Sequence, residues 1–424
     1  MQPEEEQVTL AAERAEATAK TGAYRRLFAT AGFRKFILTT AFQRVSIAMA
    51  PVALVLAGHA ALGSFRIGAL MASAYTFANA IASPLLGRLI DRMELRRAMS
   101  VQLSVAIVSL LVLAGLASSH APALALITLS GLAGAAPAGV LGGMRAYLLR
   151  IIPGDLRERA FALDSMLLEL EWMTAPALVA VTGFLGAQVL AIGLMALATL
   201  GALGGTRLLD QQPPSKRAPG MNGAWRNRQA LPVYLLNAVL SYADGTINIA
   251  LAPLLVVIGS RPAVAGLLIT LVSATSAMGG AGYATFVARR PGNLDQRANG
   301  GLLALGLCVV LIATAPSLVV LAIATAVCGV WFAPIVGIRN VILGKLLPES
   351  QLSEGFSTLA AAGSLGYGVS GVATGIVLGL AGARACFILA AAITVTSGLV
   401  AGIGHHFSHV HHVRGALEAS DSET

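Results

Sequence analysis

Charged and aromatic residues are scarce in this chain. Only 12% of its 424 residues are Asp, Glu, Lys or Arg, and only 5% are aromatic, whereas 56% are hydrophobic and the mean hydropathy is +0.77. A soluble domain carries about 25% charged residues, so this composition excludes an ordinary soluble protein. Long Ala/Leu/Gly/Val runs, rather than alternating segments of about ten residues, also exclude an outer-membrane barrel. We predict an all-α integral membrane protein.

Several motifs of other protein classes are also missing. The three cysteines, Cys308, Cys328 and Cys386, lie in apolar runs, which offers neither a disulfide framework nor a CxxC metal site. There is no GxxxxGK[ST] for nucleotide hydrolysis, no GxSxG and no HExxH. We therefore expect no enzyme activity, no cofactor and no metal. An integral-membrane enzyme or a scaffold without transport is the rival from another class.

Apolar runs of about 20 residues, the length that crosses a bilayer, recur along the chain. They predict twelve spans near 36–58, 66–86, 98–117, 122–144, 160–184, 187–207, 231–258, 263–287, 299–315, 318–343, 356–380 and 384–404. The resulting parts are a tail (1–35), a six-helix bundle (36–208), a basic, Pro-containing linker (209–230), a second six-helix bundle (231–404) and a His-rich tail (405–424).

Most of the 29 lysines and arginines fall in alternate loops and in the two tails, and we count Arg339 with one of these loops. The opposite loops hold only Arg66, Arg261 and Arg384. Because cytoplasmic loops are the basic ones, both termini are predicted to be cytoplasmic, in a multi-pass protein of the cytoplasmic membrane. The net charge of +9 then reflects orientation and not nucleic-acid binding.

The two predicted bundles resemble each other. "IAMAPVALVL" (47–56) parallels "IALAPLLVVI" (249–258), and "PGDLRERAF" (153–161) parallels "PESQLSEGF" (348–356). A duplication of this kind, with a site near the midplane where the halves meet, is one known plan of secondary transporters.

The loop "GRLIDRMELRR" (87–97) resembles the signature loop of the major facilitator superfamily. Gly87, Asp91, Arg92, Arg96 and Arg97 match the family pattern, while Glu94 replaces its second glycine. The resemblance implies a twelve-helix transporter with a cytoplasmic latch, in which this loop meets the start of the eleventh helix (353–359) and holds the outward-facing state.

Ionisable residues inside apolar runs are candidates for a transport role, because charges in a bilayer are costly. Arg44 on the first span and Glu169 on the fifth lie at similar predicted depth, and Glu171 lies slightly deeper on another face. Asp164 shares the face of Glu171 but lies closer to the cytoplasm. A resemblance of "LDSMLLE" (163–169) to bacterial family members favours Glu169 as the partner of Arg44, either as a structural clamp or as part of a substrate or proton site.

Asp244 lies near the midplane of the seventh span, in "LSYADGTINIA" (240–250). The Asp-Gly pair predicts a local helix irregularity there, of the kind tolerated where the backbone lines a cavity. Asp244 is the preferred proton-carrier candidate, and a residue hydrogen-bonded to a neighbouring helix is the alternative.

Two further patterns receive simpler interpretations. Gly371, Gly375 and Gly379 form a small-residue face that predicts close helix packing. "HHFSHVHH" (405–412) is rich in metal-binding side chains, but we do not expect a specific metal site there.

Together, these features predict a secondary active transporter that moves a small molecule by alternating access, as a monomer in a lipid bilayer. Proton-driven export is the leading expectation, and proton-coupled uptake is the alternative.

Overall fold

The structure is a computed structural model, and it describes residues 26–153, 156–210, 227–283, 293–347 and 352–421. These residues form helices joined by short connections, without a strand in any of the five ranges. The all-α prediction is therefore confirmed for the described part of the chain. The predicted tail 1–35 and linker 209–230 lie largely outside the described residues.

Helices coincide with the predicted apolar runs to within several residues at their ends. The first group comprises α2 (Ala31–Leu62), α3 (Phe65–Arg92), α4 (Leu95–Ser118), α5 (Ala123–Ala135), α6 (Val140–Ile151), α7 (Arg157–Phe184) and α8 (Leu190–Leu208). The second comprises α9 (Leu231–Val257), α10 (Val264–Gly282), α11 (Leu294–Thr314), α12 (Leu318–Gly329), α13 (Phe332–Leu346) and α14 (Leu352–Asp421).

Element α14 is two helices joined across a kink. Gly382 has φ 82° and ψ −179°, a backbone conformation that an L side chain rarely adopts. The kink lies between the last two predicted spans, 356–380 and 384–404. A glycine is therefore what allows the chain to turn back with so short a connection.

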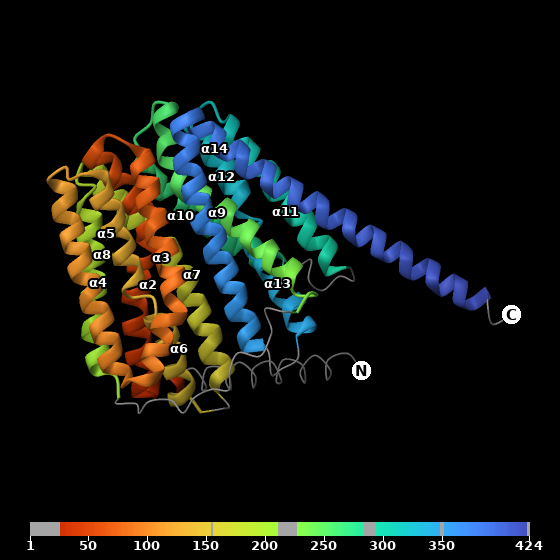
Figure 1. The fold of residues 1–424 in the computed structure, drawn as a ribbon, viewed down its shortest axis with the longest axis horizontal. Coiled ribbons are helices and arrows are strands. Elements are labelled where there is room, and N and C mark those ends of the chain that lie inside the picture. The colour runs from red at the N-terminus through yellow and green to blue at the C-terminus, as the bar shows by residue number, and fades with distance from the viewer. Residues whose placement is uncertain (1–25, 154–155, 211–226, 284–292, 348–351, 422–424) are drawn as a thin grey trace, which may run out of the picture.

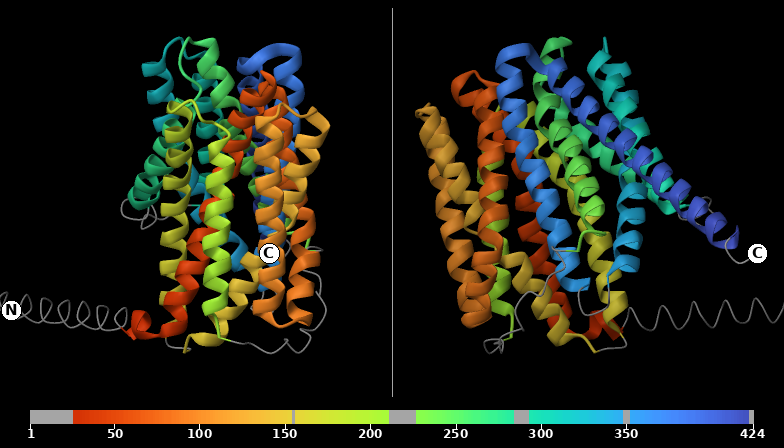
Figure 2. Two further views of the ribbon diagram at one scale, coloured as in Figure 1. Left: turned by 90° about the vertical axis from the view of Figure 1, so that its left-hand side faces the viewer. Right: turned by 45° about the vertical axis from the view of Figure 1, so that its right-hand side comes forward.

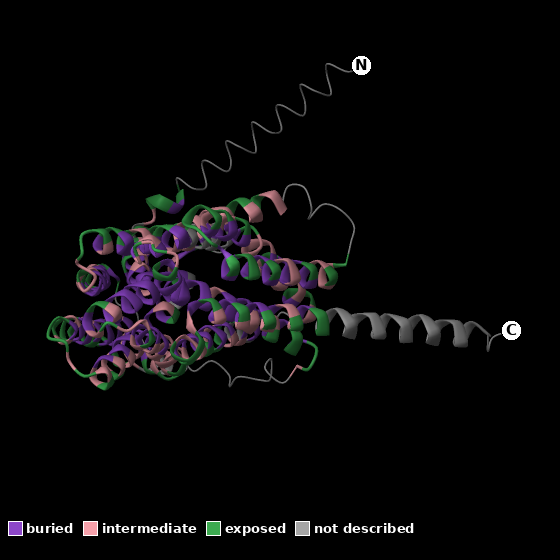
Figure 3. Cartoon of the chain, turned by 90° about the horizontal axis from the view of Figure 1, so that it is seen from above, coloured by how far each residue is buried: buried purple, intermediate pink, exposed green. Residues whose placement is uncertain are grey.

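Nine helices within the described residues are long and apolar enough to cross a membrane, and one of these stretches, Thr358–Val400, contains the kink at Gly382. Their outer faces carry large exposed apolar side chains such as Leu124, Val319 and Leu380, while buried residues fill the interior (Figure 3). Apolar surface of this extent is stable against lipid and not against water. The fold is that of a multi-pass membrane protein.

The helices pack in two groups that meet along two seams. In the first group α2 packs against α3, α7 and α8; in the second α14 packs against α9 and α11. Figures 1 and 2 show the earlier segments (red to yellow-green) on one side and the later ones (green to blue) on the other. The groups touch where α3 meets α14 and where α7 meets α10.

Small residues bring these seams close together. A Cβ added at Gly371, Gly375 or Gly379 of α14 would contact α3, at Ser73, Leu70 and Arg66 respectively. The packing role predicted for this glycine face is confirmed.

The prediction of a helix irregularity at Asp244 is wrong. Helix α9 is continuous from Leu231 to Val257 and passes through Asp244 and Gly245 without a break. A Cβ on Gly245 would collide with Ser370 Oγ and approach Tyr367 on α14. Gly245 therefore serves close helix packing rather than a bend.

Candidate functional site

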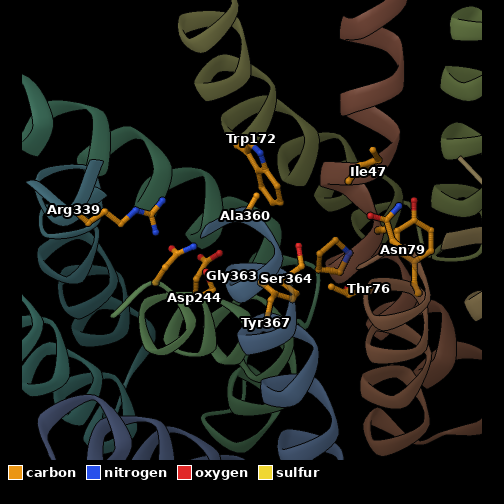
Figure 4. A pocket seen from close by; sticks show the side chains of 15 residues that line it. Ile47, Thr76, Asn79, Trp172, Asp244, Arg339, Ala360, Gly363, Ser364 and Tyr367 are labelled. Carbon is orange, nitrogen blue, oxygen red and sulfur yellow. The ribbon is translucent and has the colours of Figure 1, made fainter. Parts of the chain in front are cut away.

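A cavity of about 310 Å³ lies between the two groups of helices. Helices α2, α3 and α7 line one side, and α9, α13 and α14 line the other (Figure 4). The lining is mixed: Trp172, Tyr75 and Pro51 offer apolar surface, and several polar side chains face the same space. These polar residues are Thr76, Asn79, Asn237, Ser241, Asp244, Arg339, Ser364 and Tyr367.

The cavity is closed toward one end of the bundle. There the α3–α14 seam runs through the contacts of Ser73, Leu70 and Arg66 with the glycine face of α14. Toward the other end, Ile81 and Leu85 of α3 are 63% and 60% exposed, and no atom of the described residues lies within 4 Å of a Cβ built on Gly87. The two groups are thus tightly joined on one side of the cavity, and on the other side α3 carries exposed apolar side chains.

Asp244 lines this cavity. Asn248, one turn further along α9, donates from Nδ2 to Asp244 Oδ1 at 3.1 Å and to its backbone carbonyl at 2.9 Å. These bonds fix the carboxylate on the cavity-facing side of α9.

Arg339 lines the same cavity and was missed as a site residue. It was assigned to a basic loop, but it lies in α13, within the candidate membrane span Leu318–Leu346. The signal was present in the sequence: Arg339 falls inside the predicted span 318–343.

A second polar group, the Arg44 cluster, consists of Arg44 on α2 with Asp164 and Glu171 on α7. Arg44 Nη1 lies 2.8 Å from Asp164 Oδ1, and Arg44 Nη2 donates to Asp164 Oδ2 at 2.9 Å. Glu171 Oε2 lies 3.9 Å from Arg44 Nη1. All three side chains are at most 7% exposed. The cluster is a two-pronged ion pair with a more distant second carboxylate.

The described partners of Arg44 are Asp164 and Glu171 and not the predicted Glu169, whose pairing with Arg44 stays a prediction. Asp164 and Glu171 are seven residues apart, two turns along one face of α7, whereas Glu169 is about 140° around the helix from Asp164. A helical side chain also leans toward the N-terminus of its helix, so the guanidinium meets the carboxylate nearer the start of α7. The Glu169 side chain itself lies outside the described part of the structure.

The signature loop is described only in part. Glu94 is the N-cap of α4 with φ −62°, so no glycine is required at this position. Arg96 is half-buried and Arg97 is exposed in the first turn of that helix. The side chains of Asp91 and Arg92, and those of Ser353, Glu354 and Ser357 in the segment 353–359, lie outside the described residues.

Within the described residues no group of three or more His, Cys, Asp or Glu side chains could hold a metal ion. The His-rich segment 405–412 lies beyond the side chains that are described.

The fold and cavity define a helical membrane protein with a polar site between two groups of helices. A family model described as Major Facilitator Superfamily matches residues 36–294, more than half of the chain. The chain therefore belongs to the major facilitator superfamily. It is a multi-pass secondary transporter of small molecules and not an enzyme.

Solved structures share this fold at low sequence identity. The nucleoside transporter NupG has a TM-score of 0.70 and 14% identity, covering 87% of this chain and 99% of that chain. The POT family transporter PepTSo has a TM-score of 0.72 and 11% identity, covering 90% and 99%. The human organic anion transporter MFSD10 (TETRAN) has a TM-score of 0.56 and 18% identity, covering 88% and 99%. No curated protein matches the sequence.

Proposed function

We propose that this protein is a proton-coupled transporter of the cytoplasmic membrane that binds its substrate in the central cavity and works by alternating access. The observation that carries the proposal is the cavity itself, which has both polar and apolar lining, lies between two groups of helices and is closed at one end. Twelve crossings, in bundles 36–208 and 231–404 with both termini in the cytoplasm, account for the arrangement.

This orientation assigns a state to the conformation. The closed end is where α3 begins and the open end is where α3 terminates, beside the basic loop 87–97. Since basic loops are cytoplasmic, the cavity is open to the cytoplasm. The open space at Gly87 fits this state, because the latch of the signature loop is expected to close only when the transporter faces outward.

The Arg44 cluster supplies a reason for proton coupling. It holds two carboxylates and one guanidinium, and the sequence of α10, which packs against α7, adds no charged residue. A net negative charge buried in a bilayer is costly, so a proton on one carboxylate stabilises the cluster. Asp164 makes the short contacts with Arg44. Glu171, at 3.9 Å, is therefore the carboxylate that holds the proton.

Asp244 is the second proton candidate, because it faces the cavity directly. The direction of transport is proposed as export in exchange for protons, and proton-coupled uptake is the alternative. A test with imposed gradients separates the two. In exchange, protons move in the direction opposite to the substrate, whereas in symport they move in the same direction.

The test is proton movement in liposomes containing the purified protein, followed with an internal pH-sensitive dye while candidate compounds are added. We expect compound-dependent proton movement by the natural protein. Glu171→Gln should lose this movement yet retain exchange of labelled for unlabelled substrate, which requires no net proton transfer. Glu94→Gln removes a carboxylate at the start of α4 and serves as the matched control.

The outcomes assign the carrier. If Glu171→Gln keeps full proton movement and Asp244→Asn loses it, the proton site is in the cavity and not in the Arg44 cluster. If no compound in a broad panel produces proton movement in either direction, proton coupling is refuted.

A further inference from the structure

Arg339 is an intramembrane cation whose role is not explained by the fold. Its side chain extends from α13 toward the other residues that line the central cavity (Figure 4). Its Nε atom is buried and has no hydrogen-bond partner among the described residues. No ion pair to Arg339 occurs within this part of the chain either.

Arg44 provides a comparison within the same molecule. Its side chain is only 4% exposed, and it is neutralised by the Asp164 carboxylate on the neighbouring helix. A guanidinium at membrane depth requires an anionic partner or a wet cavity, and it presents a planar array of donors that fits carboxylate and phosphate groups. Arg339 has the cavity, and among the described residues no carboxylate forms an ion pair with it as Asp164 does with Arg44.

Other features of the cavity lining also favour a ligand. Asn237 Oδ1 and Tyr367 Oη are buried without a hydrogen-bond partner in the described residues. Trp172 and Tyr75 offer flat apolar surface on the opposite side. Small-molecule sites combine apolar walls with a few placed polar groups in this way.

We propose that the cavity binds a small organic anion, with a carboxylate or phosphate group held by the Arg339 guanidinium and an apolar body against Trp172. This inference rests on the proposed function, because it names the class of substrate for the same cavity. Asp244 carries the opposite charge in this cavity, so it competes with the anion for Arg339. Removing its charge should therefore tighten anion binding.

The test is isothermal titration calorimetry on the purified full-length protein with four compounds that share a phenyl ring: benzoate, phenyl phosphate, benzamide and benzylamine. We expect at least one of the two anions to bind at least about 10-fold more tightly than neutral benzamide or cationic benzylamine. Comparing benzoate with phenyl phosphate distinguishes a carboxylate from a phosphate preference.

Variants assign the effect to Arg339. Arg339→Gln should weaken anion binding about 10- to 100-fold, Arg339→Lys should keep part of it, and Asp244→Asn should strengthen it. Arg207→Gln, an exposed arginine at the end of α8, is the matched control and should bind like the natural protein. A merely structural role of Arg339 would not produce opposite effects of the Arg339 and Asp244 variants.

The inference is overturned if the natural protein binds neither anion better than benzamide, or if Arg339→Gln binds the anions equally well. The first result needs no variant, so it stands even if Arg339→Gln fails to fold. Proton movement that persists alongside such a result would leave the proposed function intact. Tight anion binding without any coupled proton movement would refute coupling and leave this inference standing.

Discussion

Arg44 is stabilised in the membrane by its two-pronged contact with Asp164, and a double-variant cycle measures this. Their side chains are 4% and 7% exposed, so Arg44→Met leaves two carboxylates buried without a cation. Breaking a buried pair typically costs about 3–5 kcal/mol. Asp164→Leu should cost less, because Glu171 is only 3.9 Å from Arg44 and can approach it. In the double variant Glu171 remains alone and can be neutral, so most of the stability should return.

The assay is reversible unfolding in mixed detergent micelles, with the free energy of unfolding compared across the natural protein, both single variants and the double variant. We expect a coupling energy of about 2 kcal/mol or more between Arg44 and Asp164. The same cycle with Glu169→Leu in place of Asp164→Leu is the control and should give simple additivity. Additive losses for Arg44 and Asp164 would refute the reasoning.

Two further predictions concern packing and pH. Gly266→Val should reduce the free energy of unfolding by about 1–3 kcal/mol or more, because a Cβ there collides with the backbone carbonyl of Pro176 across the α7–α10 seam. Gly282→Ala is the control: a Cβ there meets no described atom within 4 Å, so this variant should be neutral in the same unfolding assay. Lys35 Nζ donates to Asp210 Oδ1 at 2.8 Å and holds the pKa of that carboxyl below its ordinary value of 3.8. The pair therefore stabilises the fold above pH 3.8, and this stabilisation disappears as the pH falls through the lowered pKa. Since the two side chains are 30% and 58% exposed, Asp210→Asn should cost less than about 1 kcal/mol at pH 7, and a larger loss in an unfolding titration would contradict this.

Much of the fold followed from apolar length alone. Most predicted spans lie on one helix, whereas 122–144 is divided between α5 and α6 and 318–343 between α12 and α13. The kink at Gly382 falls where two spans were separated. The glycine face of α14 was also predictable, because small residues at four-residue spacing permit close packing. These features depend on local composition and periodicity, which a single sequence contains in full.

The pairing of charges was less predictable. Asp164 was set aside for its shallow position, yet side-chain direction and the reach of arginine brought it to Arg44. Arg339 was counted as a loop charge although it lies inside a predicted span. Near the end of a helix, the sequence alone does not distinguish an arginine in a basic loop from one buried in the membrane. Gly245 suggested a bend where tertiary packing requires a small residue. In each case the missing information was which helix lies opposite, and that is set by contacts distant in sequence.

The central claim, alternating access to the cavity, is tested most directly by locking the closed seam. A Cβ on Gly371 would lie 3.1 Å from Ser73 Cβ, slightly closer than the 3.5–4.5 Å of disulfides, so Ser73→Cys with Gly371→Cys should form a disulfide with a small adjustment. The native Cys308, Cys328 and Cys386 are first replaced. A cysteine introduced by Ser364→Cys in the cavity then reports whether a membrane-impermeant thiol reagent can reach the cavity.

With the disulfide formed, the account predicts that Ser364→Cys reacts only from the cytoplasmic side. Without the locking cysteines, it should react from both sides as the protein alternates. Equal reaction from both sides in the locked protein would contradict alternating access through this seam, and reaction only from the exterior would contradict the proposed orientation.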